Sequence, residues 1–155
     1  MLGRLVSLSV PSIVYVKGAA VAGGCMLTFA HDYIFVEGKG LFACNEVDIG
    51  LPLPPGMNAV VKRKHVSYKT YRDMALFGKK FSEKEALKEG MIDGIVENLN
   101  QVVEKAQDLA PYGNNKVNFK KLKAESNKET IDACFNKQHG VGAVGFIRLP
   151  SFPKL

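Results

Sequence analysis

Apolar positions change their spacing several times along the first third of the chain, and each spacing predicts a different element. Apolar residues recur at helical intervals over 2–10, and Pro11 ends the pattern, which predicts the tail of a helix. Residues 12–16 form a short β-rich run without alternation, so we expect a buried strand. Residues 17–30 open with small residues and close with larger apolar ones. This pattern is typical of a tight turn that enters a helix packed closely against a sheet.

The remaining chain alternates between short strands and helices before it becomes mainly helical. Residues 33–37 and 41–44 are predicted to form two strands joined by a hairpin-like turn at Gly38-Lys39-Gly40. Residues 45–55 contain several prolines and are predicted to form a loop. Helices are expected at about 57–66, 68–77, 82–89, 99–110 and 115–136, with a short strand over 92–96 after the helix stop at Gly90. Ser82 and Glu85 have the spacing of a capping box. The pattern indicates an α/β chain whose strand–turn–helix units come first and whose helices come last.

Composition indicates one globular domain, since 155 residues with 46% hydrophobic content can bury one core. The net charge is +6, and the positive excess lies after residue 50, in clusters such as Lys62-Arg63-Lys64, Lys79-Lys80 and Lys120-Lys121. Such clusters could attract a polyanion, although solvated helix faces are the more common explanation. No motif with interleaved aromatic and basic residues indicates a nucleic-acid partner.

Cysteine and histidine usage excludes several classes of site. The three cysteines are odd in number and lack metal-ligand spacing, which fits a reducing compartment without structural disulfides. The three histidines lie near no nucleophile or metal motif, so no metal is expected. No apolar stretch approaches the length of a bilayer span, and no signal peptide begins the chain. We therefore expect a soluble protein without a membrane partner that is not secreted.

Two segments carry candidate chemistry. The first is Gly18–Leu27, where a strand that enters a Gly-Gly helix start brings unpaired backbone N–H groups to one point. This signal is weak alone, because Gly-Gly helix starts are often packing devices. The second is Glu46, which follows a strand among apolar neighbours that would favour its use as a base near neutral pH. An exposed loop glutamate is the alternative, and Asp48 competes for the same role.

Taken in order, these segments resemble the crotonase superfamily. The matching features are the glycine-rich helix start at Gly18–Cys25, Glu46 placed 23 residues after Gly23, and the capped helix, glycine stop and short strand over 81–93. The resemblance implies a crotonase-like spiral core of ββα units that is incomplete, because the early units would precede Met1. It divides the chain into a partial core over 1–110, a C-terminal helical region over 111–139 and a flexible tail over 140–155.

The resemblance also implies an acyl-CoA thioester as substrate, with no further cofactor. Gly23 would donate its N–H to the thioester oxygen, Glu46 would be the catalytic base, and four residues would contact substrate, namely Ala22, Gly24, Met26 and Leu51. Hydratases of this family carry a glutamate three residues after the oxyanion-hole glycine, where this chain has Met26. A thioether cannot orient water, so a Δ3,Δ2-enoyl-CoA isomerase is favoured. A hydratase and a catalytically silent crotonase-like protein remain alternatives.

The C-terminus provides an independent expectation about location. Pro153-Lys154-Leu155 is similar to the Ser-Lys-Leu peroxisomal signal, so we expect the peroxisomal import receptor as a partner and the peroxisome as the address. Peroxisomes house fatty-acid β-oxidation, in which an isomerase would act. The resemblance further implies a homotrimer or hexamer for a full-length form.

Overall fold

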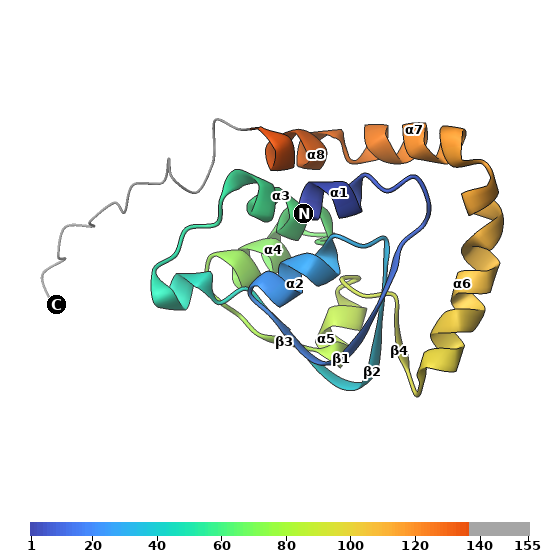
Figure 1. The fold of residues 1–155 in the computed structure, drawn as a ribbon. Helices are drawn as coiled ribbons and strands as arrows, with labels where there is room; N and C mark the ends of the chain where they lie inside the picture. Colours follow the sequence, from blue (N-terminus) through green and yellow to red (C-terminus); the bar gives the residue numbers. More distant parts are fainter. Residues whose placement is uncertain (137–155) are drawn as a thin grey trace, which may run out of the picture.

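A four-stranded sheet forms the centre of the structure, a computed structural model that describes residues 1–136 (Figure 1). Its strands are β1 (Ile13–Val21), β2 (Tyr33–Ala43), β3 (Phe81–Ser82) and β4 (Gly94–Val96). Strand β2 pairs in parallel with β1 and β4 and antiparallel with β3. In the described part of the chain, β1 pairs only with β2, so its outer edge has no partner strand. The predicted α/β class is confirmed.

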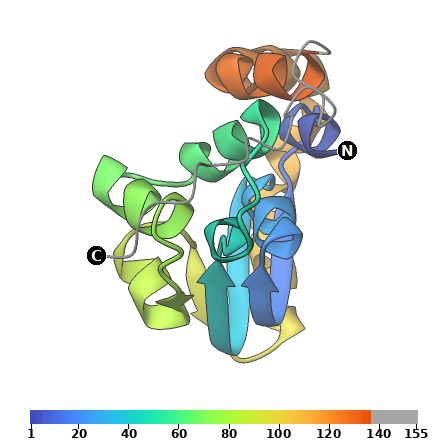
Figure 2. The same ribbon diagram turned by 90° about the vertical axis from the view of Figure 1, so that its left-hand side faces the viewer.

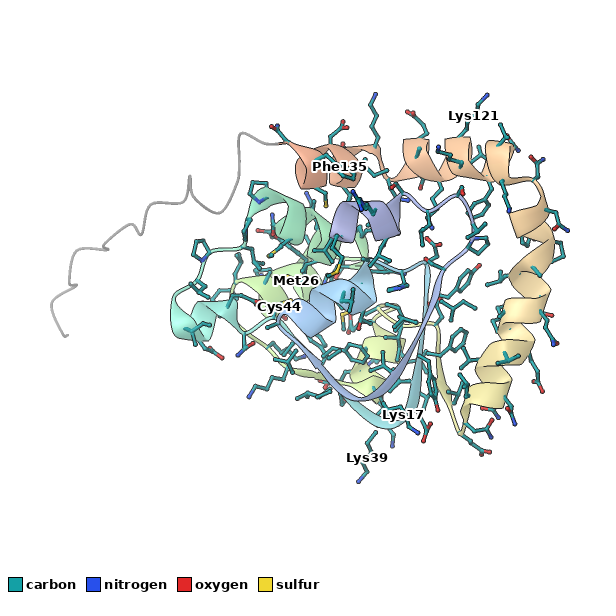
Figure 3. The ribbon with its side chains drawn as sticks, viewed as in Figure 1. Lys17, Met26, Lys39, Cys44, Lys121 and Phe135 are labelled. Carbon is teal, nitrogen blue, oxygen red and sulfur yellow. The ribbon has the colours of Figure 1, made fainter. Side chains whose placement is uncertain are left out.

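Both long strands bend sharply, and the predicted hairpin at Gly38-Lys39-Gly40 is wrong. Residues 33–43 form one continuous strand that stays parallel to β1, with a register shift between Lys17 and Gly18. Gly18 and Gly38 have φ values of 84° and 61°, a region that favours glycine. The glycines therefore bend the paired strands together instead of reversing the chain. Figure 3 shows Lys17 and Lys39 at this bend.

Eight α-helices and one 3-10 helix surround the sheet in the part of the chain that the structure describes (Figures 1 and 2). They are α1 (Leu2–Val6), α2 (Gly23–Phe29), η1 (Glu46–Ile49), α3 (Pro55–Arg63), α4 (Tyr68–Ala75), α5 (Glu83–Lys88), α6 (Leu99–Asn114), α7 (Lys116–Ser126) and α8 (Lys128–Phe135). The predicted Ser82–Glu85 capping box is confirmed. Over residues 1–136, no helix is both long and apolar enough to span a bilayer.

Several predicted helix boundaries differ from the structure. Helix α3 begins earlier than expected, because Pro55 occupies a first-turn position where its missing N–H costs nothing. Helix α6 continues through Pro111 to Asn114 instead of ending at residue 110. The single helix predicted over 115–136 is divided at Asn127. The side chain of Asn127 accepts from Arg63 Nε at 3.0 Å and donates to the Lys123 carbonyl at 2.9 Å, which stabilises the break.

The hydrophobic core lies between the sheet and helices α2 and α3. Phe29 of α2 stacks on Phe42 of β2 with ring centroids 6.3 Å apart. Val60 and Val61 of α3 are fully buried against the same cluster. Burial of these side chains contributes about 1.5–3 kcal/mol each relative to exposure. The core therefore fixes α2 against the sheet, and α2 begins at the candidate site.

Helix α8 packs closely on α3 through Gly56, and we expect Gly56→Ala to lower the free energy of unfolding by about 1–3 kcal/mol. A Cβ at this position would lie 2.8 Å from Cys134 Cα and 3.1 Å from the Ala133 carbonyl oxygen. Backbone cannot move aside as a flexible side chain can. The matched control is Gly113→Ala in α6, where the nearest atom would lie 3.8 Å away. Urea unfolding checks both variants, and equal stability of parent and Gly56→Ala would contradict this packing.

His65 is the one histidine whose two ring nitrogens are both buried without a hydrogen-bond partner in residues 1–136. Its ring packs edge-on against Phe29 with centroids 5.7 Å apart and against Tyr71 with centroids 6.1 Å apart. Burial lowers the pKa of His65 from 6.5 to about 4. The folded protein therefore holds this imidazole in its neutral form.

Acid is expected to destabilise the protein through His65. Between pH 6.5 and about 4 the unfolded chain binds a proton that the folded chain does not, so stability falls as pH falls through this window. Allowing for partial solvent screening, the loss is about 1–2 kcal/mol. We expect His65→Leu to remove this contribution, which unfolding curves at pH 7 and pH 4.5 would show. An unchanged pH dependence in the variant would exclude His65 as its source.

Candidate active site

The glycine-rich segment forms a sharp corner where β1 enters α2. Ala22 has φ 50° and ψ −123°, and it is the one non-glycine residue with positive φ among residues 1–136. Such a conformation costs about 1–3 kcal/mol and persists only where the surroundings enforce it. Here the Ala22 N–H donates to the Ala43 carbonyl at 2.9 Å, which ties the corner to the end of β2. The strand predicted over 12–16 continues to Val21, so Gly18 lies inside β1 and the tight turn expected within 17–30 falls at Ala22.

Gly23 and Gly24 are the first two residues of α2, and both are exposed. The first helical hydrogen bond runs from the Met26 N–H to the Ala22 carbonyl, so the N–H groups of Gly23 and Gly24 precede it and lack a helical acceptor. A Cβ on either glycine would meet no atom within 4 Å. This open space lets a polar oxygen of a substrate approach the backbone donors directly.

Glu46 is the first residue of η1, directly after the loop that leaves β2. Its Oε2 atom is buried, with no hydrogen-bond partner in the described chain. The Leu51 N–H donates to the Glu46 carbonyl at 2.9 Å and closes the turn around η1. A carboxylate oxygen shielded from water and free of hydrogen bonds is available to accept a proton from carbon.

Two cysteines connect the elements that carry Gly23 and Glu46. Parallel pairing sets Val21 opposite Ala43, so the C-terminal ends of β1 and β2 lie at the same edge of the sheet. Just beyond these strand ends, Cys25 and Cys44 share a hydrogen bond. Together with burial, it raises the pKa of the Cys25 thiol well above its ordinary value. The charge of Glu46 also acts on Cys25 in the same direction. Figure 3 labels Met26 of α2 and Cys44, which follows β2.

The other predicted site residues occupy different environments. Met26 is 2% exposed and belongs to the hydrophobic core, whereas Leu51 is 45% exposed beside η1. Sequence reasoning did not select three partly exposed apolar residues on the same elements, Leu27 of α2 and Val47 and Ile49 of η1. The signal in the sequence was the presence of apolar residues, Val47 and Ile49, directly after the candidate base, which fits an apolar ligand.

Asp48, the competing carboxylate, is exposed. Its Oδ1 atom lies close to Gly78, because a Cβ built on that glycine would be 3.2 Å from it. In the described residues, no group of three or more histidine, cysteine, aspartate or glutamate side chains could hold a metal. The geometry therefore brings Gly23 and Glu46 to one end of the sheet, whereas Asp48 is exposed to solvent beside Gly78.

Comparison with known families identifies the scaffold. The model of the enoyl-CoA hydratase/isomerase family matches residues 1–139. The chain belongs to this family. Among curated relatives, Enoyl-CoA delta isomerase 3 of Arabidopsis thaliana is 38% identical over 94 residues, which cover 60% of this chain and 40% of the relative. Enoyl-CoA delta isomerase 1, peroxisomal, of the same plant is 33% identical over 110 residues, which cover 70% of this chain and 46% of the relative.

Solved structures agree on the fold. An enoyl-CoA hydratase from Mycobacterium marinum superimposes with a TM-score of 0.81 at 25% identity, covering 92% of this chain and 64% of the other. An enoyl-CoA isomerase from Mycobacterium tuberculosis gives the same TM-score at 23% identity and therefore supports the fold alone. The match spans less than half the length of the plant relatives. The crotonase-like core with C-terminal helices predicted from sequence is confirmed.

Proposed function

We propose that the protein isomerises 3-enoyl-CoA to trans-2-enoyl-CoA, with Glu46 as the single base and the Gly23 N–H as an oxyanion donor. The observation that carries the proposal is the buried, unpartnered Oε2 of Glu46 at the same end of the sheet as the exposed first N–H groups of α2. The names of the plant relatives, which are enoyl-CoA delta isomerases, support the same reaction class.

The reaction balances with one carboxylate. Glu46 would take the proton from C2 of the 3-enoyl thioester, and the electron pair would move into a dienolate whose oxygen accepts the Gly23 N–H. The carboxylic acid of Glu46 would then return the same proton to C4, so that the double bond ends between C2 and C3. A backbone donor aimed at the developing oxyanion contributes about 3–4 kcal/mol to such a step.

Met26 disfavours the hydratase alternative. Hydration needs a second group that orients water, and a buried thioether, a weak acceptor at best, neither takes up a proton nor orients water for attack. In the proposed site Met26, which is buried in the core, would pack behind the apolar wall beside the acyl chain, while Ala22, Gly24 and Leu51 would contact the substrate. No cofactor beyond the acyl-CoA substrate enters this scheme.

The deciding experiment is an assay of the 155-residue protein with a 3-enoyl-CoA. The ultraviolet absorbance of the conjugated product measures the reaction. We expect isomerisation by the parent and a rate lowered by about 10²–10⁴-fold in Glu46→Gln. A parallel assay with a 2-enoyl-CoA would detect hydration as loss of that absorbance. Hydration without isomerisation would replace the proposal with a hydratase. Acyl-CoA binding without either reaction would establish the silent alternative.

We further propose that the protein acts in peroxisomes, as a homotrimer or hexamer in a full-length form. Two plant relatives carry the word peroxisomal in their names. The tripeptide Pro153-Lys154-Leu155, which we propose binds the import receptor, lies outside the described residues. A fluorescent protein that carries the last ten residues is expected to collect in peroxisomes, and deletion of Lys154-Leu155 is expected to leave it in the cytosol. Cytosolic fluorescence with the intact tag would refute this address.

A further inference from the structure

A cavity of about 1390 Å³ lies between the core and the arm formed by α6 and α7. The start of β2 and the end of α3 form one side of the cavity, and α6, α7 and the start of α8 form the other. Figure 1 shows α6 and α7 standing beside the core, on the side away from η1. The cavity is therefore a separate place from the proposed isomerase site.

Asp32 lines this cavity, and both of its carboxylate oxygens have partners. Its Oδ2 atom accepts from the Ser12 N–H at 2.8 Å and from the Ser12 hydroxyl at 2.9 Å, and the Lys123 ammonium also contacts it. The Arg63 guanidinium lies 3.7 Å from Oδ1. Lys123 is buried, with 6% of its side chain exposed, so this ion pair fixes α7 to the core. One carboxylate thus forms ion pairs with two cations, Arg63 and Lys123.

Three further ammonium groups line the same cavity without a carboxylate partner in residues 1–136, those of Lys62, Lys64 and Lys128. Within residues 1–136, Lys64 donates to the backbone carbonyl of Asp32. Burial, followed by the charge of Arg63, lowers the pKa of Lys64 to about 8. Six basic and four acidic side chains line the cavity, which leaves an excess of two positive charges. A partly enclosed positive excess attracts small anions more strongly than a flat surface does.

We propose that this cavity binds the phosphate groups of a small polyanion through Lys62, Lys64 and Lys128. A diphosphate carries enough negative charge for the unpaired ammonium groups and fits easily within the volume. The three lysines reach the cavity from two separate elements, because Lys62 and Lys64 lie at the end of α3 and Lys128 begins α8. The same chemistry is offered by a free polyphosphate and by the nucleotide end of coenzyme A.

The test is calorimetric titration of the 155-residue protein with inorganic pyrophosphate at low salt. Lys62→Glu/Lys128→Glu is expected to weaken binding by at least about tenfold, since it reverses two of the charges facing the anion. Lys120→Glu/Lys121→Glu makes the same change in net charge at exposed positions of α7 that do not line the cavity. This control is expected to change the affinity less than about twofold.

Absence of pyrophosphate binding, or equal weakening in both double variants, would overturn the proposal. A second arm identifies the source of the phosphate. If coenzyme A displaces pyrophosphate and its own binding is weakened by Lys62→Glu/Lys128→Glu, the site holds the nucleotide end of the thioester. If coenzyme A leaves pyrophosphate bound, the ligand is a free polyphosphate. Neither result depends on isomerase activity, so failure of one proposal is distinguishable from failure of the other.

Discussion

Glu46→Gln is expected to lower kcat for 3-enoyl-CoA isomerisation by about 10²–10⁴-fold, the contribution typical of a positioned general base. Glutamine keeps the shape of the side chain and loses the ability to take a proton from C2. KM is expected to stay within a few-fold of the parent, because the amide leaves the space occupied by the carboxylate unchanged. Steady-state kinetics at neutral pH would measure both constants.

Asp48→Asn is the matched control, since Asp48 is an exposed carboxylate on the same 3-10 helix. Its kcat is expected to remain within about threefold of the parent, a range typical of surface polar changes away from reacting atoms. If Glu46→Gln retains activity within a few-fold while Asp48→Asn loses it, the base is Asp48 and the assignment of Glu46 is wrong.

Gly23→Pro is expected to lower kcat by about 10²–10³-fold, the cost of removing one oxyanion-hole donor. Proline has no N–H, and its fixed φ suits the first position of a helix, where Gly23 lies. Gly23→Ala is the control, because it keeps the N–H and its Cβ meets no protein atom within 4 Å.

The strained corner at Ala22 makes a folding check necessary for this variant. Far-UV circular dichroism and thermal unfolding should show that Gly23→Pro is folded before its rate is interpreted. Turnover equal to that of Gly23→Ala in a folded Gly23→Pro protein would show that another group binds the thioester oxygen.

Sequence reasoning located the two ends of the candidate site and missed the geometry between them. The spacing of Gly23 and Glu46 and the element order could be read directly, because both depend on local patterns. The strained φ of Ala22 could not be predicted, since alanine rarely adopts that region and the contact that enforces it comes from Ala43. The shared hydrogen bond of Cys25 and Cys44 likewise depends on the pairing of two strands.

The errors in the fold have the same origin. Gly38-Lys39-Gly40 fits a reversal as well as a bend, and only the parallel partner β1, which bends at Gly18, decides between them. Residues 115–136 have continuous helical character, and the break at Asn127 depends on Arg63, which is 64 residues away. Local patterns therefore predicted element types, whereas long-range contacts determined where the elements bend and end.

The unpaired outer edge of β1 has a consequence for solubility. A long, flat edge strand would offer its free backbone groups to a second chain and promote aggregation. The bend at Gly18 divides this edge into two short segments that point in different directions, and the charged side chain of Lys17 lies at their junction, bound to Glu37 at 3.1 Å. A further strand could pair along the whole of β1 only if it bent at the same place, as β2 does at Gly38. The glycine that shapes the strand therefore also restricts which strand can pair along that edge.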